Sequence, residues 1–308
     1  MATIPADRSG VRPVIVADGE IQTVPADATP ARRTHRGTRI AAIAALSVAG
    51  VLFTYPFVWL VSASLKPRAQ VFDNKLIPGQ VVTQNYVDVW KAAPVFTWLL
   101  NTIAVGLAAA VAVTVSSALV AFGFAYFRFP GRGVLFGLVL GSMMLPAVVT
   151  IVPTFLIWNS VGLVGSQVPL WGGNLFGSAI YIFLLRQFFL GLPRDVFEAA
   201  RVDGLGYFGL FWRIAVPLSK PALIIAFVFE LRASWTDLVK PLVYLQDPEL
   251  FTLPRGLKAV LDQFGQGGEG QWEVVLAASV IATLPMLLVF VVAQRYFVQG
   301  ISTTGRTG

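Results

Sequence analysis

The sequence contains no cysteine, one histidine and few charged residues. Without cysteine the chain has no disulfide, thiolate metal ligand or cysteine nucleophile. The lone histidine, His35, excludes Ser-His-Asp triads and multi-histidine metal sites. Only 13% of the 308 residues are charged, whereas soluble domains contain about 25%. These shortages argue against a water-soluble enzyme, and we expect no catalytic residue, bound metal or cofactor.

Hydrophobic residues make up 56% of the chain, and the mean hydropathy is +0.72. Uncharged runs of roughly 20 residues predict helices that cross about 30 Å of hydrocarbon, since only a helix satisfies its own backbone in lipid. The uncharged stretch 133–185 is too long for one crossing and contains a polar, glycine-rich break at 159–166. We therefore predict an all-α, polytopic membrane protein with six transmembrane helices in a membrane domain over 39–298, at about 40–65, 99–127, 133–157, 168–190, 221–245 and 274–295.

The fifth of these spans carries charged residues, namely Glu230, Arg232, Asp237 and Lys240. Its length is right for a crossing, and without it the two termini would lie on opposite sides of the membrane. We therefore count it as a span.

The distribution of Lys and Arg predicts the orientation. A cytoplasmic N-terminus would place fifteen of these residues inside and seven outside, as the positive-inside rule requires. We expect a multi-pass protein of the cell membrane with both termini cytoplasmic. Residues 1–38 are predicted to form a disordered cytoplasmic tail, and 299–308 a cytoplasmic C-terminal tail. The net charge of +7 then reflects contact with anionic membrane lipid rather than nucleic acid.

The loop at 191–217 differs from the other connections. Pro193 suits a first helical position, and Asp195 lies close to the positive end of the helix dipole. Arg194, Glu198 and Arg201 have the spacing of ion pairs along a helix, and Gly204 suits the position after the helix end. A second helix is predicted to present one aromatic face and to end near Pro217, the aromatic residues being Tyr207, Phe208, Phe211 and Trp212. Two interpretations remain open, an amphipathic hairpin in the lipid headgroups or a knob that docks on a soluble partner.

Glu198-Ala199-Ala200, followed at a fixed spacing by Gly204 and by Ile214-Ala215-Val216-Pro217, resembles the EAA signature of ATP-binding-cassette importer permeases. Further stretches resemble the second permease of maltose-type carbohydrate importers: Ser64-Leu65-Lys66-Pro67, Ala125-Tyr126-Phe127-Arg128-Phe129-Pro130-Gly131 and Arg295-Tyr296-Phe297-Val298-Gln299-Gly300. The resemblance covers about 40–305. It implies a transport subunit, not an enzyme, for a sugar or oligosaccharide.

The same resemblance implies that the 191–217 loop forms coupling helices which insert into the ATPase subunit. The residues carried over are Glu198, Ala199, Ala200, Asp203, Gly204 and Pro217, with Tyr207, Phe208 and Phe211 as adjacent packing. The chain contains no phosphate-binding Gly-x4-Gly-Lys-Ser/Thr motif, so ATP must be hydrolysed by a partner. The implied partners are an ATP-binding-cassette ATPase dimer, a second, homologous permease, an extracellular solute-binding protein and the carbohydrate itself.

Polar residues within the spans are candidates for the translocation path, since such residues are costly in lipid. Glu230, Ser234 and Asp237 are spaced to share one helix face, next to Trp235 as a sugar-stacking candidate. Asn101 and Thr150 are further candidates. Structural pairing between helices explains the same charges equally well. A different function, a proton-coupled secondary transporter using Glu230 and Asp237 as a relay, is the competing hypothesis.

Overall fold

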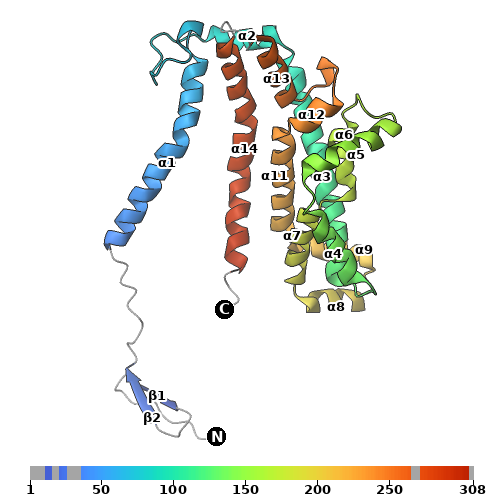
Figure 1. The fold of residues 1–308 in the computed structure, drawn as a ribbon. Coiled ribbons are helices and arrows are strands. Elements are labelled where there is room, and N and C mark those ends of the chain that lie inside the picture. Colours follow the sequence, from blue (N-terminus) through green and yellow to red (C-terminus); the bar gives the residue numbers. More distant parts are fainter. Residues whose placement is uncertain (1–10, 16–20, 26–35, 265–270, 305–308) are drawn as a thin grey trace. The chain divides into compact units, whose positions relative to one another are not determined.

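The computed structural model describes residues 11–15, 21–25, 36–264 and 271–304 (Figure 1). The chain forms two compact units, residues 1–57 and 58–308. Helix α1 (Arg36–Ser64) begins in the first unit and ends in the second.

The described part of the first unit contains a β-hairpin ahead of α1. Strands β1 (Val11–Ile15) and β2 (Ile21–Pro25) pair antiparallel, with Val11 opposite Pro25 and Ile15 opposite Ile21. Both strands are rich in β-branched residues, which favour extended backbone. For these ten residues the expectation of a disordered tail is wrong, and most of the remaining tail lies outside the described residues.

The second unit is helical wherever the structure describes regular elements. Its longer helices are α3 (Val95–Tyr126), α4 (Arg132–Ser142), α5 (Ala147–Ser160), α7 (Ala179–Leu190), α11 (Lys220–Thr236), α13 (Leu253–Phe264) and α14 (Trp272–Thr304). Shorter helical segments join them: η1 (Arg68–Gln70), α2 (Gln84–Ala92), α6 (Val168–Trp171), η2 (Gly172–Phe176), α8 (Arg194–Val202), α9 (Tyr207–Gly209), η3 (Leu210–Ala215), α10 (Val216–Leu218), α12 (Val239–Tyr244) and η4 (Pro248–Leu250).

By length and composition, the described residues contain four helical segments that can cross a membrane, or up to six if each of two bent pairs is one span. The predicted third span is one such pair, because α4 and α5 meet at 101°. Pro146 is the N-cap of α5, with extended backbone at ψ 133°. Proline lacks the N–H that would continue the α4 ladder, so the break falls immediately before it.

The ends of the last two predicted spans differ from the structure. Helix α11 ends at Thr236, and a separate helix, α12, follows, so 221–245 is not one continuous helix. Helix α14 runs to Thr304, past the expected start of the C-terminal tail at 299. Gly300 therefore does not end the helix, and residues 305–308 lie outside the described part.

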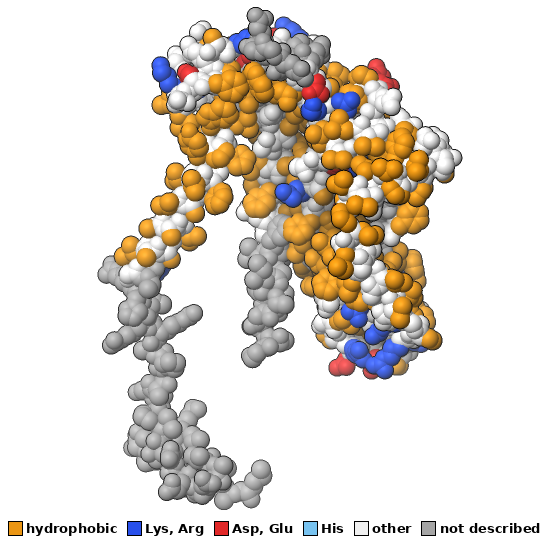
Figure 2. Space-filling view, viewed as in Figure 1, with side chains coloured by type: hydrophobic (Ala, Val, Ile, Leu, Met, Phe, Trp, Pro, Cys, Tyr) orange, Lys and Arg blue, Asp and Glu red, His pale blue; other side chains and the backbone are white. Residues whose placement is uncertain are grey.

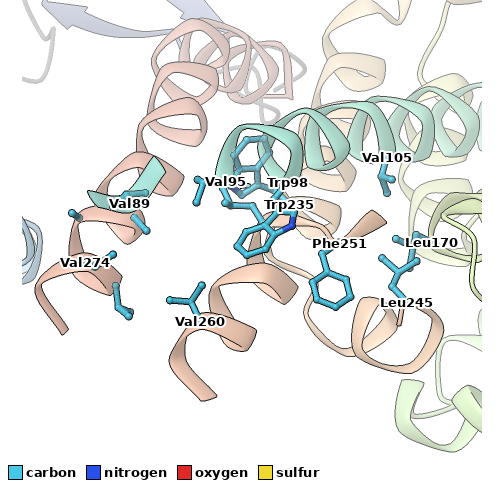
Figure 3. Packing of buried hydrophobic residues seen from close by; sticks show 14 of the residues in the cluster. Val89, Val95, Trp98, Val105, Leu170, Trp235, Leu245, Phe251, Val260 and Val274 are labelled. Atoms are coloured by element: carbon cyan, nitrogen blue, oxygen red, sulfur yellow. The ribbon is translucent and has the colours of Figure 1, made fainter. Parts of the chain in front are cut away.

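Helix α3 is central to the second unit and packs against α7, α11 and η2. Its first half contributes Trp98 and Val105 to one buried cluster, which Figure 3 shows together with Trp235 and Phe251. Its second half contributes to another cluster, with Val113, Phe122 and Phe124. Figure 1 shows α8 and α9 at one end of this unit and α2 and α13 at the other. Figure 2 shows most charged side chains at the two ends and mainly hydrophobic side chains between them, the distribution expected of a bilayer-spanning bundle.

Candidate functional site

Helix α8 forms the first part of the 191–217 loop, as predicted. Pro193 is its N-cap residue, at φ −61° and ψ 122°, rather than its first helical residue, and Asp195 lies in the first turn. Glu198 and Ala199 are exposed, Ala200 is half-buried, and Val202 is 88% exposed. The helix therefore presents one side outward while Phe197, which is 6% exposed, anchors the other.

Gly204 ends α8 in a left-handed conformation, as predicted. Its φ is +86°, a region that residues with a Cβ enter only with strain. The Leu205 N–H donates to the Ala200 carbonyl at 3.0 Å, and the Gly204 N–H donates to the Arg201 carbonyl at 3.0 Å. These two bonds form a Schellman motif, with Asp203 as the C-cap residue. The turn after α8 is thus defined by backbone geometry.

The four aromatic residues after this turn do not share one exposed face. Phe208 is 72% exposed, Tyr207 49% and Trp212 42%, whereas Phe211 is only 3% exposed. The prediction of one aromatic face is wrong because this segment becomes a π-helix, η3, which changes the angular spacing of side chains. Phe208 and Trp212 remain as an exposed pair, with ring centroids 6.1 Å apart.

Buried aromatic rings join the loop to the α3 helix. Phe197 lies 6.3 Å from Phe122 and 5.7 Å from Tyr126, and Phe211 lies 5.4 Å from Phe122, measured between ring centroids. Aromatic pairs at such distances stabilise packing beyond the area they bury. The loop is therefore packed against the end of α3 through aromatic rings.

The side chain of Arg201 contacts Tyr207. Its Nη1 donates to the Tyr207 hydroxyl at 2.8 Å, and its guanidinium carbon lies 4.6 Å from the ring centroid. This hydrogen bond raises the pKa of Arg201 above its usual value. None of the ion pairs among the described residues joins Glu198 to Arg194 or Arg201, so the expected pairing along α8 is wrong.

The loop leaves through Pro217, an exposed residue in the short helix α10. The segment Tyr207–Leu218 meets α11 at 81°. Ser219, at the bend, is fully buried. The bend gives the loop a direction different from that of the following span.

Two of the candidate path residues, Asn101 and Thr150, have hydrogen-bond partners within the protein. The side-chain amide of Asn101 donates to the carbonyls of Glu249 and Phe251, at 2.8 and 3.0 Å, and so holds a loop against α3. The Thr150 hydroxyl donates to the Ala147 carbonyl in its own helix at 2.9 Å. The structure does not bring these two residues together with the candidates on α11.

The two acidic candidates in the predicted fifth span, Glu230 and Asp237, have different partners and do not lie on one helix face. Glu230 accepts a 2.5 Å hydrogen bond from the Asn174 amide. Asp237 lies beyond the end of α11, at ψ 119°, and accepts hydrogen bonds from the N–H groups of Val239 and Lys240, at 3.0 and 3.2 Å. The predicted common face therefore holds for Glu230 and Ser234 but not for Asp237, because the chain becomes extended there and the Asp237 carboxylate accepts from backbone N–H groups in the first turn of α12.

Trp235 is 7% exposed, and its Nε1 donates to the Ala282 carbonyl of α14 at 3.2 Å. This burial favours a packing role over sugar stacking. A different stripe of α11 is exposed, formed by Phe229, Arg232, Ala233 and Thr236 at the i, i+3, i+4, i+7 spacing of one helix face. This stripe was not predicted from the sequence.

The arrangement joins a rigid, outward-facing helix to the central span of an apolar bundle. Residues 117–303 match the family described as the binding-protein-dependent transport system inner membrane component. The chain belongs to this family. It is a multi-pass membrane permease, and the ATPase activity of such importers lies in a partner subunit.

Relatives with similar sequences cover most of the chain. The arabinooligosaccharides transport system permease protein AraQ of Bacillus subtilis is 32% identical over 88% of this chain and 96% of its own length. The sn-glycerol-3-phosphate transport system permease protein UgpE of Yersinia pestis is 34% identical over 87% of this chain and 97% of its own length. A chain from a bacterial ABC transporter that imports the acidic polysaccharide alginate superposes with a TM-score of 0.74 at 24% identity, covering 85% of this chain and 98% of that one.

These comparisons do not support the proton-coupled alternative, since the family is dependent on a binding protein. They confirm the resemblance seen in the EAA signature. The family implies an ATPase and a second permease as partners. Within the described residues, no group of three or more His, Cys, Asp or Glu could hold a metal ion.

Proposed function

We propose that the 191–217 loop couples this permease to its ATPase and that the cargo is a carbohydrate or a phosphorylated polyol. The observation that supports coupling is the construction of α8. It is exposed at Val202 and Glu198 on one side, and Phe197 fixes it to Phe122 of α3 on the other. A short helix that ends at a defined turn and is anchored by a buried side chain, here Phe197, can transmit movement of a partner as rigid-body rotation.

The docking surface comprises Glu198, Val202 and Phe208. Phe208 supplies exposed aromatic area, which is favoured at interfaces. We place the end of the bundle that carries this surface in the cytoplasm, because this orientation agrees with the fifteen-to-seven distribution of Lys and Arg.

The test uses Glu198→Lys and Phe208→Ala in the complex reconstituted with its ATPase, second permease and binding protein. We expect at least tenfold weaker ATPase association or uncoupled hydrolysis, since the loss of an interface anchor typically costs about 2 kcal/mol or more. Ile77→Ala is the matched control, as Ile77 is 81% exposed near η1, away from the loop. Wild-type association and uptake in both loop variants would exclude the coupling role.

The cargo class rests on the relatives, whose printed substrates are arabinooligosaccharides, sn-glycerol-3-phosphate and alginate. We propose that the exposed stripe of α11 lines the translocation path. A guanidinium and a hydroxyl, from Arg232 and Thr236, can donate hydrogen bonds to sugar oxygens or to an anionic substituent. We expect Arg232→Leu to lower uptake while Arg232→Lys retains more of it. Equal uptake by both variants and the wild type would remove Arg232 from the path.

A further inference from the structure

A cavity of about 320 Å³ lies where the ends of α3 and α7 meet the start of α8. Three arginines line it, Arg128, Arg132 and Arg194, together with one acidic residue, Glu198. Figure 2 shows basic side chains gathered at this end of the bundle. The cavity is therefore a site of net positive charge, which we call the basic cavity.

The guanidinium groups of the basic cavity have few protein partners. Arg132 Nη1 donates to the Phe127 carbonyl at 3.0 Å. None of the ion pairs found among the described residues involves Arg128 or Arg194, and both side chains are exposed. Arg186 adds a further positive charge close to Arg132. Guanidinium groups with few protein partners are suited to binding an anionic group.

A second hollow adjoins the basic cavity on α3. Its lining is apolar except for one arginine, and it comprises Val120, Gly123, Phe124, Phe127, Arg128 and Phe129. Gly123 opens it, because a Cβ built there would meet nothing within 4 Å. We call it the apolar groove. Arg128 lines both hollows.

The basic cavity and the apolar groove lie at the ends of membrane-spanning helices, where the surface of a bilayer is expected. Tyr126 is the last residue of α3, Leu190 the last of α7 and Arg194 the first of α8. Helices α3 and α7 belong to segments long and apolar enough to cross a membrane. The arginines therefore lie at the level of the lipid headgroups, while the apolar groove runs back along a span.

We propose that these two hollows bind one anionic phospholipid, with its phosphate in the basic cavity and an acyl chain in the apolar groove. A free phosphate would use only the arginines, and an acidic protein segment would leave the groove empty. A lipid uses both, with Arg128 at the junction between headgroup and chain. Basic pockets at the ends of membrane helices are suited to anionic headgroups. Because Arg194 belongs to α8 and the cavity is also lined by the ends of α3 and α7, the bound lipid joins α8 to these two helices. This proposal does not depend on the coupling role of the loop.

The test measures lipid binding to the purified full-length chain by native mass spectrometry and by titration in detergent. The probes are phosphatidylglycerol and phosphatidylcholine with identical long acyl chains, a short-chain phosphatidylglycerol, and inorganic phosphate. We expect preferential binding of long-chain phosphatidylglycerol. The double variant Arg128→Gln/Arg194→Gln should weaken it by roughly 25-fold, at about fivefold for each arginine. Arg213→Gln, which removes an exposed arginine that does not line the cavity, should bind as the wild type does.

The groove is tested separately by Gly123→Leu, with Gly123→Ala as a milder version. Filling the groove should weaken the binding of long-chain phosphatidylglycerol and leave the binding of the short-chain lipid unchanged. Gly137→Leu is the matched control, since Gly137 is also open in its helix. Three results would overturn the proposal. The first is equal affinity for phosphatidylglycerol and phosphatidylcholine, and the second is an affinity for phosphate as high as that for lipid together with no effect of Gly123→Leu. The third is loss of bound lipid when the ATPase binds, which would assign the cavity to a protein interface.

Discussion

The side-chain amide of Asn174 donates hydrogen bonds to Glu230 Oε1 at 2.5 Å and to the Ala109 carbonyl at 3.2 Å. Asn174 therefore ties the η2 turn to both α11 and α3. The Tyr181 side chain also interacts with Glu230. The charged residue that a proton-coupled mechanism would require is held in a structural contact between helices.

The first prediction concerns Glu230. Glu230→Gln keeps an acceptor oxygen for Asn174, so we expect normal assembly and ATP-driven uptake. Glu230→Leu leaves the amide without this acceptor, and we expect a loss of about 1–3 kcal/mol in the free energy of unfolding. Thermal unfolding in detergent and uptake in proteoliposomes measure the two effects, with Glu249→Leu, at an exposed position, as the control. Loss of uptake in an assembled Glu230→Gln complex would contradict this prediction.

The second prediction separates backbone strain at Gly204 from side-chain bulk. Gly204 has φ +86° and Gly206 has φ −71°, and a Cβ at either position meets nothing within 4 Å. Gly204→Val should therefore cost about 1–2 kcal/mol through backbone strain alone, whereas Gly206→Val should not. We expect only Gly204→Val to reduce ATPase association and uptake, with normal membrane insertion of both. Equal behaviour of the two variants would show that the left-handed turn has no role.

The third prediction concerns pH. Lys66 is fully buried, and its Nζ lies 2.5 Å from Asp73 Oδ1 and 2.6 Å from the Lys75 carbonyl. The hydrogen bond from Lys66 lowers the pKa of Asp73 below 3.8. A carboxyl pKa that is lower in the folded state adds stability above the unfolded pKa, and this stability is lost as the pH falls through the folded pKa.

Melting temperatures of the wild type and Asp73→Asn should therefore differ at neutral pH, with the variant less stable because buried Lys66 loses its counter-charge. The difference should shrink as the pH falls below about 3.8. Asp88→Asn, at an exposed ion pair, is the control. A difference that does not change with pH would exclude the ion pair as its cause.

The fourth prediction concerns close packing at Gly256. A Cβ at this position would overlap the ring of Trp98. Trp98 is 3% exposed, and its Nε1 donates to the Pro248 carbonyl at 2.8 Å. The ring cannot move without breaking this bond, so Gly256→Ala should destabilise the chain by about 1–3 kcal/mol. Gly137→Ala should be neutral or stabilising. Thermal unfolding in detergent compares them, and an unchanged melting temperature for Gly256→Ala would contradict the contact.

The fifth prediction concerns topology. Single cysteines can be introduced against a cysteine-free background. Val161 and Val202 are 60% and 88% exposed. In the proposed orientation, Val161→Cys reacts with an impermeant maleimide in intact cells, and Val202→Cys reacts only after permeabilisation and removal of the ATPase. Labelling of Val202→Cys in intact cells would show that the proposed orientation is wrong.

Local chemistry explains what could be predicted from the sequence about the loop. Gly204 was recognisable because a helix end needs a residue that tolerates positive φ, and this depends on neighbours along the chain. Phe211 was not recognisable as buried, because its burial depends on Phe122 from a distant helix and on the π-helical turn that precedes α10. The basic cavity was missed for the same reason. Arg128 and Arg132, from the α3–α4 connection and the start of α4, meet Arg194 of α8 only in the folded chain.

The sequence by itself determined the class of protein, the approximate spans, the α8 helix and the family signature, since these depend on hydrophobic run length and local backbone chemistry. Tertiary structure decided which polar groups meet. It paired Glu230 with Asn174 and Asp237 with the first backbone N–H groups of α12. It also used Asn101 to hold a loop and left Arg232 exposed. Helical spacing states which residues share a face, but the neighbours of that face are set by segments far apart in the chain. Those neighbours determine whether a buried charge is satisfied or left for a ligand.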